Sequence, residues 1–162
     1  RLVRDWSSDV CSSDLSDLPV SDKCTAVLSE FGISHEVRVA SAHRAPKYLE
    51  DVVASAIDDG CKIFIGMAGM AAALPGVVAA MTTLPVIGVP VGGKVPLDSL
   101  LSIVQMPPGM PVATVGVDRG DNAAVLAIQM LAMNDADLAA NFSEWRNSRT
   151  AQVIADDESL RE

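Results

Sequence analysis

From residue 16 onward, the apolar positions alternate between a helical period and the short continuous runs of buried strands. Val20, Cys24 and Val27 begin one apolar helical face, and Gly32 marks its end. Glu36 opens a short alternating strand. The same analysis predicts helices over about 16–31, 46–59, 97–105 and 135–162. It predicts two more, one that follows the small-residue loop 66–76 and ends near residue 81, and one that follows the loop 118–122 and ends at residue 133. Strands are predicted over 36–40, 62–65, 85–89 and 111–117.

Strands that alternate with helices at this spacing predict a three-layer α/β fold: a flavodoxin-like parallel sheet with helices on both faces. A C-terminal helical tail, 135–162, would follow the α/β domain at 16–134. Parallel strands end at the same edge of their sheet, so the loops 41–46, 66–71, 90–96 and 118–122 should meet there. In the tail, Leu138, Phe142 and Trp145 could contact a neighbouring subunit or pack on their own domain.

Residues 1–15 do not follow this pattern. Ser-Ser-Asp occurs twice, and the segment lacks the Val/Ile/Leu run of a buried parallel strand and the apolar core of a signal peptide. Residues 5–15 resemble the translation of a sequencing-library adapter, so we expect a non-native leader on a truncated reading frame. An ordinary disordered tail is the alternative. The first strand that should precede the helix at residue 17 is then missing.

Composition narrows the class of function. The net charge of −9 and the pI near 4.5 argue against a nucleic-acid or anionic membrane surface, since both need basic stripes. The charge-free stretch 63–93 is interrupted by nine glycines and prolines, which argues against a membrane span. Three cysteines without metal spacing are typical of a reducing cytosol, and we expect a cytoplasmic protein.

His43 is the best candidate for chemistry. Its side chain titrates near neutral pH, which suits general acid/base work. Arg44 offers a planar fork for a phosphate or carboxylate, and Ser41 adds a hydroxyl beside a helix start. A purely structural histidine is the alternative reading. His35 lies among polar residues and we expect it to be exposed.

Two further sites carry weaker signals. Ser16 and Asp17 could bind a phosphate and ribose hydroxyls, but simple helix capping explains both. The small residues of 66–76 would let a ligand approach backbone N–H groups, although close helix–sheet packing would need them equally. Nucleophilic triads, metal-ligand spacings and dinucleotide or P-loop motifs are absent from the sequence, so we expect no metal and no cofactor.

Three stretches together resemble one family, the N5-carboxyaminoimidazole ribonucleotide mutases of purine biosynthesis, also called PurE. They are Ser-Ala-His-Arg-Ala-Pro at 41–46, Ala-Ala-Leu-Pro-Gly at 72–76 and Leu-Asp-Ser-Leu-Leu-Ser-Ile-Val-Gln-Met-Pro at 97–107. Asp-Arg-Gly-Asp-Asn-Ala-Ala at 118–124 is similar to the archaeal variant. The resemblance covers residues 16 to about 133.

The resemblance implies transfer of a carboxyl group from the exocyclic nitrogen of an aminoimidazole ribonucleotide to ring carbon C4, without cofactor. His43 corresponds to the family's general acid/base. Seven residues correspond to substrate contacts: Ser16, Ser41 and Arg44 for phosphate, Asp17 for ribose, and Ala68, Gly69 and Met70 for the carboxylate. The family assembles as homo-octamers, and its substrate implies a functional link to the ATP-dependent carboxyaminoimidazole ribonucleotide synthase.

The sequence departs from the family in two places. Most bacterial members carry a second histidine where this chain has Ala73, and glycines where it has Met67 and Met70. Direct carboxylation of aminoimidazole ribonucleotide by carbon dioxide is therefore an alternative activity. Asp14 stands where the family has its first phosphate-binding serine, which places an anion against an anion. We expect the chain as written to bind substrate poorly and to be impaired by loss of its first strand.

Two hypotheses come from other classes of protein. A related domain of nickel-pincer cofactor synthesis has a similar Ala-Gly-Met loop but should lack the 41–44 motif, so that motif argues against it. A non-catalytic nucleotide-binding subunit is the other, and replacement of His43 tests it.

Overall fold

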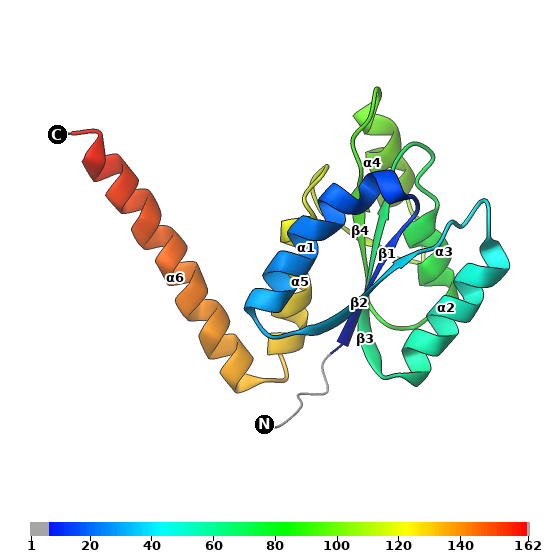
Figure 1. The fold of residues 1–162 in the computed structure, drawn as a ribbon, viewed down its shortest axis with the longest axis horizontal. Coiled ribbons are helices and arrows are strands. Elements are labelled where there is room, and N and C mark those ends of the chain that lie inside the picture. Colours follow the sequence, from blue (N-terminus) through cyan, green and yellow to red (C-terminus); the bar gives the residue numbers. More distant parts are fainter. Residues whose placement is uncertain (1–6, 162) are drawn as a thin grey trace. The chain divides into compact units, whose positions relative to one another are not determined.

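The computed structural model describes residues 7–161, which form two compact units, one ending at Ala127 and one beginning at Ile128. The first unit is built on a five-stranded parallel sheet in the order β2-β1-β3-β4-β5, which is the flavodoxin-like order (Figure 1). The strands are β1 (Ser7–Ser12), β2 (Ser34–Val39), β3 (Cys61–Ala68), β4 (Val86–Pro90) and β5 (Ala113–Thr114). The predicted fold class is confirmed.

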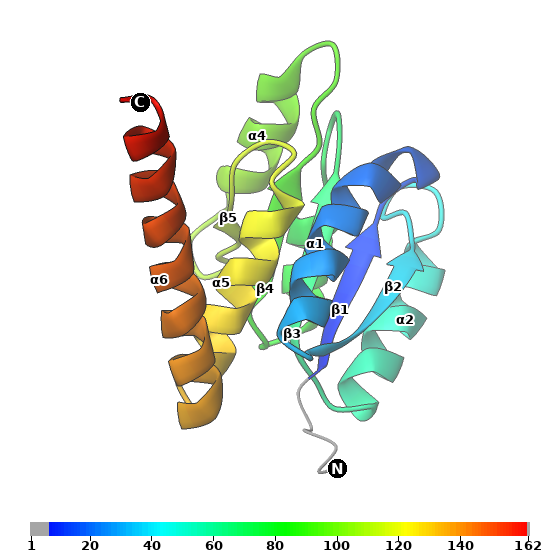
Figure 2. The same ribbon diagram turned by 60° about the vertical axis from the view of Figure 1, so that its left-hand side comes forward.

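Helices cover both faces of the sheet. The connecting helices are α1 (Leu18–Glu30), α2 (Pro46–Asp58), α3 (Leu74–Met81), α4 (Pro96–Val104) and α5 (Gly120–Ala132), and a 3₁₀ turn (Leu15–Asp17) precedes α1. α1 and the first turns of α5 lie on one face, and α2, α3 and α4 lie on the other (Figures 1 and 2). α4 approaches the sheet closely at Gly88, where a Cβ would lie 2.4 Å from Cγ2 of Ile103.

The core lies between the sheet and these helices. Phe64 of β3 belongs to one buried cluster with Leu49 and Val53 of α2, Leu74 and Val78 of α3, and Ile103 of α4. The charge-free stretch 63–93 thus supplies two buried strands and a helix. No helix within residues 7–161 is long and apolar enough to cross a membrane.

The second unit holds the end of α5 and the long helix α6 (Ala136–Ser159). Asp135 caps α6 by accepting a hydrogen bond from the backbone N–H of Leu138 at 2.9 Å. Phe142 stacks on Trp145 with ring centroids 5.9 Å apart, and the guanidinium of Arg149 lies 4.6 Å from the same tryptophan ring. The predicted C-terminal helix is confirmed, whereas a contact between subunits through it stays a prediction.

The expectation that residues 1–15 hold no strand is wrong for Ser7–Ser12. These residues form β1 inside the sheet, paired in parallel with β2 on one side and β3 on the other. A strand between β2 and β3 satisfies backbone N–H and C=O groups that would otherwise lie at two open edges. The backbone ladder therefore outweighs the polar side-chain pattern, and the premise of impairment through a missing first strand fails.

β1 carries its polar side chains into the core at a cost. Ser8 and Asp9 are 1% and 4% exposed, and Ser8 Oγ has no hydrogen-bond partner. The Sγ of Cys11 lies 3.9 Å from Oδ1 of Asp9, a weak contact for a buried carboxyl group. Each such group costs about 1–3 kcal/mol relative to a satisfied or apolar one. Residues 1–6 of the predicted leader lie outside the described residues, and its adapter origin stays a prediction, as do the boundaries at residues 15 and 134.

β5 is shorter than the predicted strand 111–117. Proline at positions 107, 108 and 111 removes backbone donors around its start. Val115 still donates to the carbonyl of Gly88 at 3.1 Å, but Asp118 turns the chain with a φ of +57°. The pairing with β4 therefore stops after a few residues.

Candidate active site

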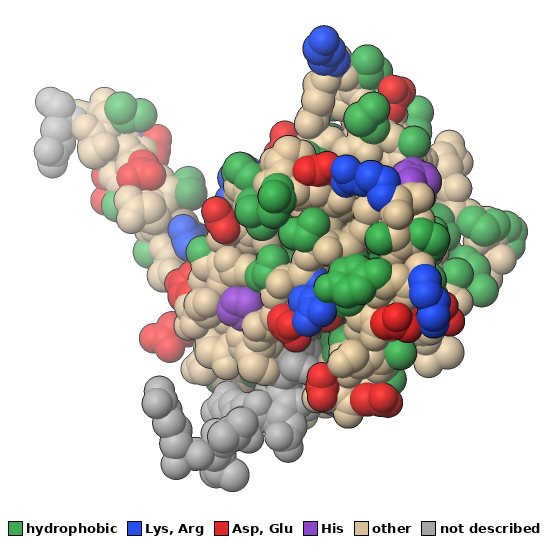
Figure 3. Space-filling view, turned by 45° about the vertical axis from the view of Figure 1, so that its right-hand side comes forward, with side chains coloured by type: hydrophobic (Ala, Val, Ile, Leu, Met, Phe, Trp, Pro, Cys, Tyr) green, Lys and Arg blue, Asp and Glu red, His purple; other side chains and the backbone are tan. Residues whose placement is uncertain are grey.

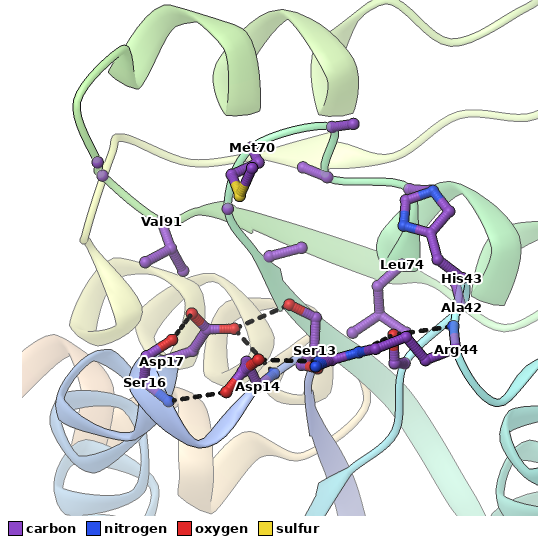
Figure 4. Close-up of a pocket in the computed structure, with 18 residues that line it drawn as sticks. Ser13, Asp14, Ser16, Asp17, Ala42, His43, Arg44, Met70, Leu74 and Val91 are labelled. Carbon is purple, nitrogen blue, oxygen red and sulfur yellow. Dashed lines mark hydrogen bonds and ion pairs between the residues drawn. The ribbon is translucent and has the colours of Figure 1, made fainter.

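The carboxyl ends of the strands surround a cavity of about 610 Å³, shown in Figure 4. Its walls come from the turns after β1, β2, β3 and β4, which are far apart in the sequence and meet because the strands are parallel. The lining includes all eight site residues expected from the sequence: Ser16, Asp17, Ser41, His43, Arg44, Ala68, Gly69 and Met70. The fold thus brings the candidates together at one place.

The turn after β2 holds His43, Arg44 and Ser41. Ala45 donates to the carbonyl of Ser41 at 2.9 Å, which closes the turn immediately before Pro46 starts α2. The backbone N–H and Nε of Arg44 both donate to Ser41 Oγ at 3.3 Å. His43 is exposed and lies on one side of the cavity, across from Ser16 and Asp17 (Figure 4). Proton transfer from this side chain to a bound molecule is therefore sterically open.

Asp17 organises the turn between β1 and α1. Its Oδ2 accepts hydrogen bonds from Ser13 Oγ at 2.9 Å, Ser12 Oγ at 3.2 Å and the backbone N–H of Asp14 at 3.2 Å. Its Oδ1 is bonded only weakly, by Ser16 Oγ at 3.5 Å. The side chain is 4% exposed. Asp17 therefore does more than cap a helix: it fixes the turn and directs one oxygen to the cavity lining.

Asp14 neutralises the cation of the site. Nη2 of Arg44 donates to Asp14 Oδ2 at 2.8 Å and to the carbonyl of Ser13 at 2.9 Å (Figure 4). The hydrogen bond from Arg44 and a second one from the Ser16 amide lower the pKa of the Asp14 carboxyl, so Asp14 stays charged. An anionic ligand at Arg44 must compete with this carboxylate.

The turn after β3 presents backbone to the cavity. Val91 donates to the carbonyl of Ala68 at 2.9 Å, and a Cβ on Gly69 would lie 3.5 Å from the carbonyl oxygen of Val91. Met70 has a φ of +55°, which suits glycine better, and its side chain is 83% exposed. The short side chains leave the Ala68–Gly69 backbone open to a ligand.

Sequence reasoning missed part of the lining. Ser13 contacts the cavity, as do Val91, Gly92 and Gly93; the sequence placed the loop 90–96 at this edge but named none of its residues as a site. Asp14, expected to oppose the phosphate, contacts the cavity as the partner of Arg44. Two adjacent glycines directly after a buried strand were the available signal for the 91–93 segment. The sequence placed the loop 118–122 at the same edge, but it did not indicate that a side chain of that loop holds the 91–93 segment.

The remaining reactive groups are poorly placed for chemistry. His35 lies at the opposite end of the sheet, half-buried rather than exposed, with Nδ1 2.9 Å from the carbonyl oxygen of Ile33. In Figure 3 both histidines reach the surface among interspersed acidic and basic side chains. The cysteines at positions 11, 24 and 61 are buried, and desolvation raises the pKa of each thiol, which suppresses the nucleophilic thiolate.

A larger cavity, of about 960 Å³, lies at the amino ends of β3 and β4, but Lys62 is the one charged residue in its lining. It offers no carboxylate or histidine to a ligand. Across residues 7–161, no group of three or more His, Cys, Asp or Glu side chains could hold a metal ion. Of these two cavities, the one beside His43 therefore has the chemistry of an active site.

Comparison with known proteins gives a consistent picture. The family model described as AIR carboxylase matches residues 9–152. The N5-carboxyaminoimidazole ribonucleotide mutase of Methanocaldococcus jannaschii is 53% identical over 148 residues, covering 91% of this chain and 92% of that protein. The mutase of Pyrococcus abyssi is 48% identical over 133 residues, covering 81% and 76%. The crystal structure of Treponema denticola PurE superposes with a TM-score of 0.86 at 25% identity, covering 97% and 99%.

Proposed function

This chain belongs to the AIR carboxylase family, and on that premise we propose that it is an N5-carboxyaminoimidazole ribonucleotide mutase of purine biosynthesis. The reaction moves a carboxyl group from the exocyclic nitrogen of the ribonucleotide to C4 of its imidazole ring. The observation that carries the proposal is the single cavity in which His43, the cation of Arg44 and the backbone of the 68–70 turn meet.

His43 is the proposed general acid/base. As the carbamate N–C bond breaks and carbon dioxide leaves, the nitrogen takes a proton from the imidazolium. C4 then attacks carbon dioxide, a C–C bond forms, and the C4 proton returns to the imidazole. The reaction is proton-neutral overall, so one histidine can serve both steps. The exposed position of His43 beside the cavity supports this role.

Arg44, Ser41 and Ser16 are the proposed phosphate anchor, and Asp17 the proposed ribose contact. The weakly bonded Oδ1 of Asp17 is a suitable acceptor for a ribose hydroxyl. Asp14 opposes the anchor, because its carboxylate already occupies Nη2 of Arg44 at 2.8 Å. Substrate binding should therefore be weak for this chain, not because a strand is missing but because the phosphate must displace an internal anion.

Backbone groups of Ala68, Gly69 and Met70 are proposed to line the carboxylate and carbon dioxide site. Ala73 also lines the cavity and offers no second imidazole there. This difference keeps a second activity open, direct carboxylation of aminoimidazole ribonucleotide by carbon dioxide, which is the activity that the family's description names. Enzyme supplied with the carbamate substrate and isotopically labelled bicarbonate distinguishes the two, because only the carboxylase puts label into the product at every turnover.

We also propose a homo-octamer. Leu97, Leu101 and Val104 form an exposed apolar stripe on α4, with 61%, 50% and 49% of each residue exposed. A stripe of this kind at helical spacing suits burial against another copy of the chain. Light scattering after size-exclusion chromatography measures the assembly. The labile carbamate must itself be made by an ATP-dependent carboxylation, so we propose a functional link to the corresponding synthase.

The decisive test of the catalytic role is His43→Asn. We expect turnover of N5-carboxyaminoimidazole ribonucleotide to fall by at least about a hundredfold, the scale of a lost general acid/base, while binding measured by calorimetry persists. Unchanged turnover would refute the assignment. His35→Asn is the matched control, since His35 lies at the other end of the sheet. A wild-type chain that binds the ribonucleotide without converting it would favour the non-catalytic subunit instead.

A further inference from the structure

Asp118 joins two loops across the carboxyl edge of the sheet. Its Oδ1 accepts a hydrogen bond from the backbone N–H of Gly92 at 2.7 Å, although the two residues are 26 positions apart. Its own backbone N–H donates to the carbonyl of Pro90 at 2.9 Å. Asp118 adopts a φ of +57°, an uncommon conformation for a residue with a side chain. In this conformation the carboxylate reaches the backbone of the 90–93 segment.

A side chain at position 92 would displace the Asp118 carboxylate from its contact. A Cβ on Gly92 would lie 2.6 Å from Asp118 Oδ2. Gly92 is therefore needed for close approach to the carboxylate, and its φ is not in the left-handed region. The pair is matched: the glycine makes room for the carboxylate, and the carboxylate holds the amide of the glycine.

Through Gly92, Asp118 controls one wall of the cavity without lining it. Val91, Gly92 and Gly93 form this wall. Val91 lies across the cavity from His43 (Figure 4). The Val91 N–H donates to Ala68 at 2.9 Å, and Ser99 Oγ donates to the carbonyl of Val91 at 3.0 Å. The wall is thus held by hydrogen bonds to Asp118, Ser99 and Ala68. Ala68 is also the first residue of the 68–70 turn.

The proposed reaction makes such a wall important. Carbon dioxide is free between leaving nitrogen and reaching C4, and it is small and uncharged, so ion pairs cannot retain it. Retention depends on how closely the cavity walls are held. We propose that Asp118 is a positioning residue that holds the 91–93 wall against the 68–70 turn and thereby retains carbon dioxide until C4 captures it. This inference rests on the proposed mutase function.

If carbon dioxide escapes, the nitrogen has already taken its proton, and the decarboxylated aminoimidazole ribonucleotide is released together with free carbon dioxide. A loosened wall should therefore change how the intermediate partitions between capture and escape. Loss of stability alone would lower the amount of active enzyme without altering this partition. The share of the carboxyl carbon lost to solvent is thus a readout that a merely structural role does not move.

Asp118→Gly and Asp118→Asn form the test pair. Glycine accepts the positive φ and removes the acceptor, whereas asparagine tolerates the same φ and keeps an oxygen at Oδ1. With substrate labelled in the carbamate carbon, we expect Asp118→Gly to lose about tenfold more label per product formed, the scale of one lost charge-assisted hydrogen bond. Asp118→Asn should return the loss toward the wild-type value. A reaction without enzyme corrects for spontaneous decarboxylation.

Gly92→Ala tests the contact itself. In the wild-type background the added methyl group meets Asp118 Oδ2, so label loss should rise. In the Asp118→Gly background the same methyl group should add little to the label loss. The effects of the two changes on label loss should therefore be strongly coupled. Hydrogen exchange at the Gly92 amide should accelerate in Asp118→Gly. Unchanged label loss in Asp118→Gly, with normal wild-type turnover, would overturn the role of Asp118 alone. A wild-type chain without any turnover would overturn the proposed function instead.

Discussion

Asp9 should make the stability of this protein fall as the pH rises from about 4 to about 6. Asp9 lies in the interior strand β1, and the residue is 4% exposed. Desolvation, with a smaller contribution from the charge of Glu36, raises its pKa from 3.8 to about 6, and the charge of Arg38 opposes the shift. The folded state therefore holds this proton more tightly than the unfolded state does. The resulting stabilisation is complete below pH 3.8 and lost once the pH exceeds the folded pKa.

The change Asp9→Asn isolates the effect, because it keeps the shape of the side chain and removes the charge. The separation between the two pKa values corresponds to at most about 3 kcal/mol. The cavity of about 160 Å³ beside Asp9 is large enough to admit water. Water there would screen the charge, so we expect the variant to be more stable by about 1–2 kcal/mol at pH 8. Near pH 4 the difference should vanish.

Urea unfolding followed by circular dichroism, at fixed protein concentration because assembly affects apparent stability, measures this difference from pH 4 to pH 8. Asp22→Asn is the control, since Asp22 is exposed on α1 and the change in net charge is the same. A difference between Asp9→Asn and wild type that is absent at pH 8, or that does not vary with pH, would show that Asp9 is not desolvated in the folded chain.

Three further outcomes are expected. Ser8→Ala should raise the free energy of unfolding by about 1 kcal/mol, measured in urea, because it removes a buried hydroxyl without a partner. Asp14→Ser should strengthen binding of the ribonucleotide by roughly three- to tenfold in calorimetry, and by less at high salt; equal affinity at low salt would contradict competition for Arg44. Met70→Gly should be about 1 kcal/mol more stable than Met70→Ala in thermal unfolding, since Met70 has a positive φ.

The sequence predicted the sheet and most helices because the buried strands β3 and β4 are apolar and glycine or proline marks the helix ends. It did not predict β1. Ser8, Asp9 and Ser12 are buried although they are polar. Ser12 donates through its side chain to Asp14 and Asp17, whereas Asp9 has a weak contact with the Cys11 thiol and Ser8 Oγ has no partner. Side-chain periodicity cannot indicate a strand whose main stabilisation is the backbone ladder to both neighbours.

The candidate site was predictable to the extent that its residues are adjacent in sequence. His43, Arg44 and Ser41 occupy one turn, and the parallel sheet requires that turn to meet the one after β3. The ion pair between Arg44 and Asp14 joins positions 30 residues apart, and its geometry depends on β1 occupying its place in the sheet. The sequence allowed a conflict of anions to be expected there, but not that Arg44 would resolve it by pairing with Asp14.

The wall of the cavity shows a second limit of sequence reasoning. Gly92 and Asp118 each have an ordinary explanation alone, a flexible loop and a turn residue. Two distances in the structure show that they act together. The Gly92 N–H lies 2.7 Å from Asp118 Oδ1, and a Cβ on Gly92 would lie 2.6 Å from Asp118 Oδ2. Asp118 also sits where the sequence resembles the archaeal variant of the family. Ala73 offers no second imidazole to the cavity. If Asp118 holds the 91–93 wall as proposed, the fixed wall would retain carbon dioxide in place of that missing side chain.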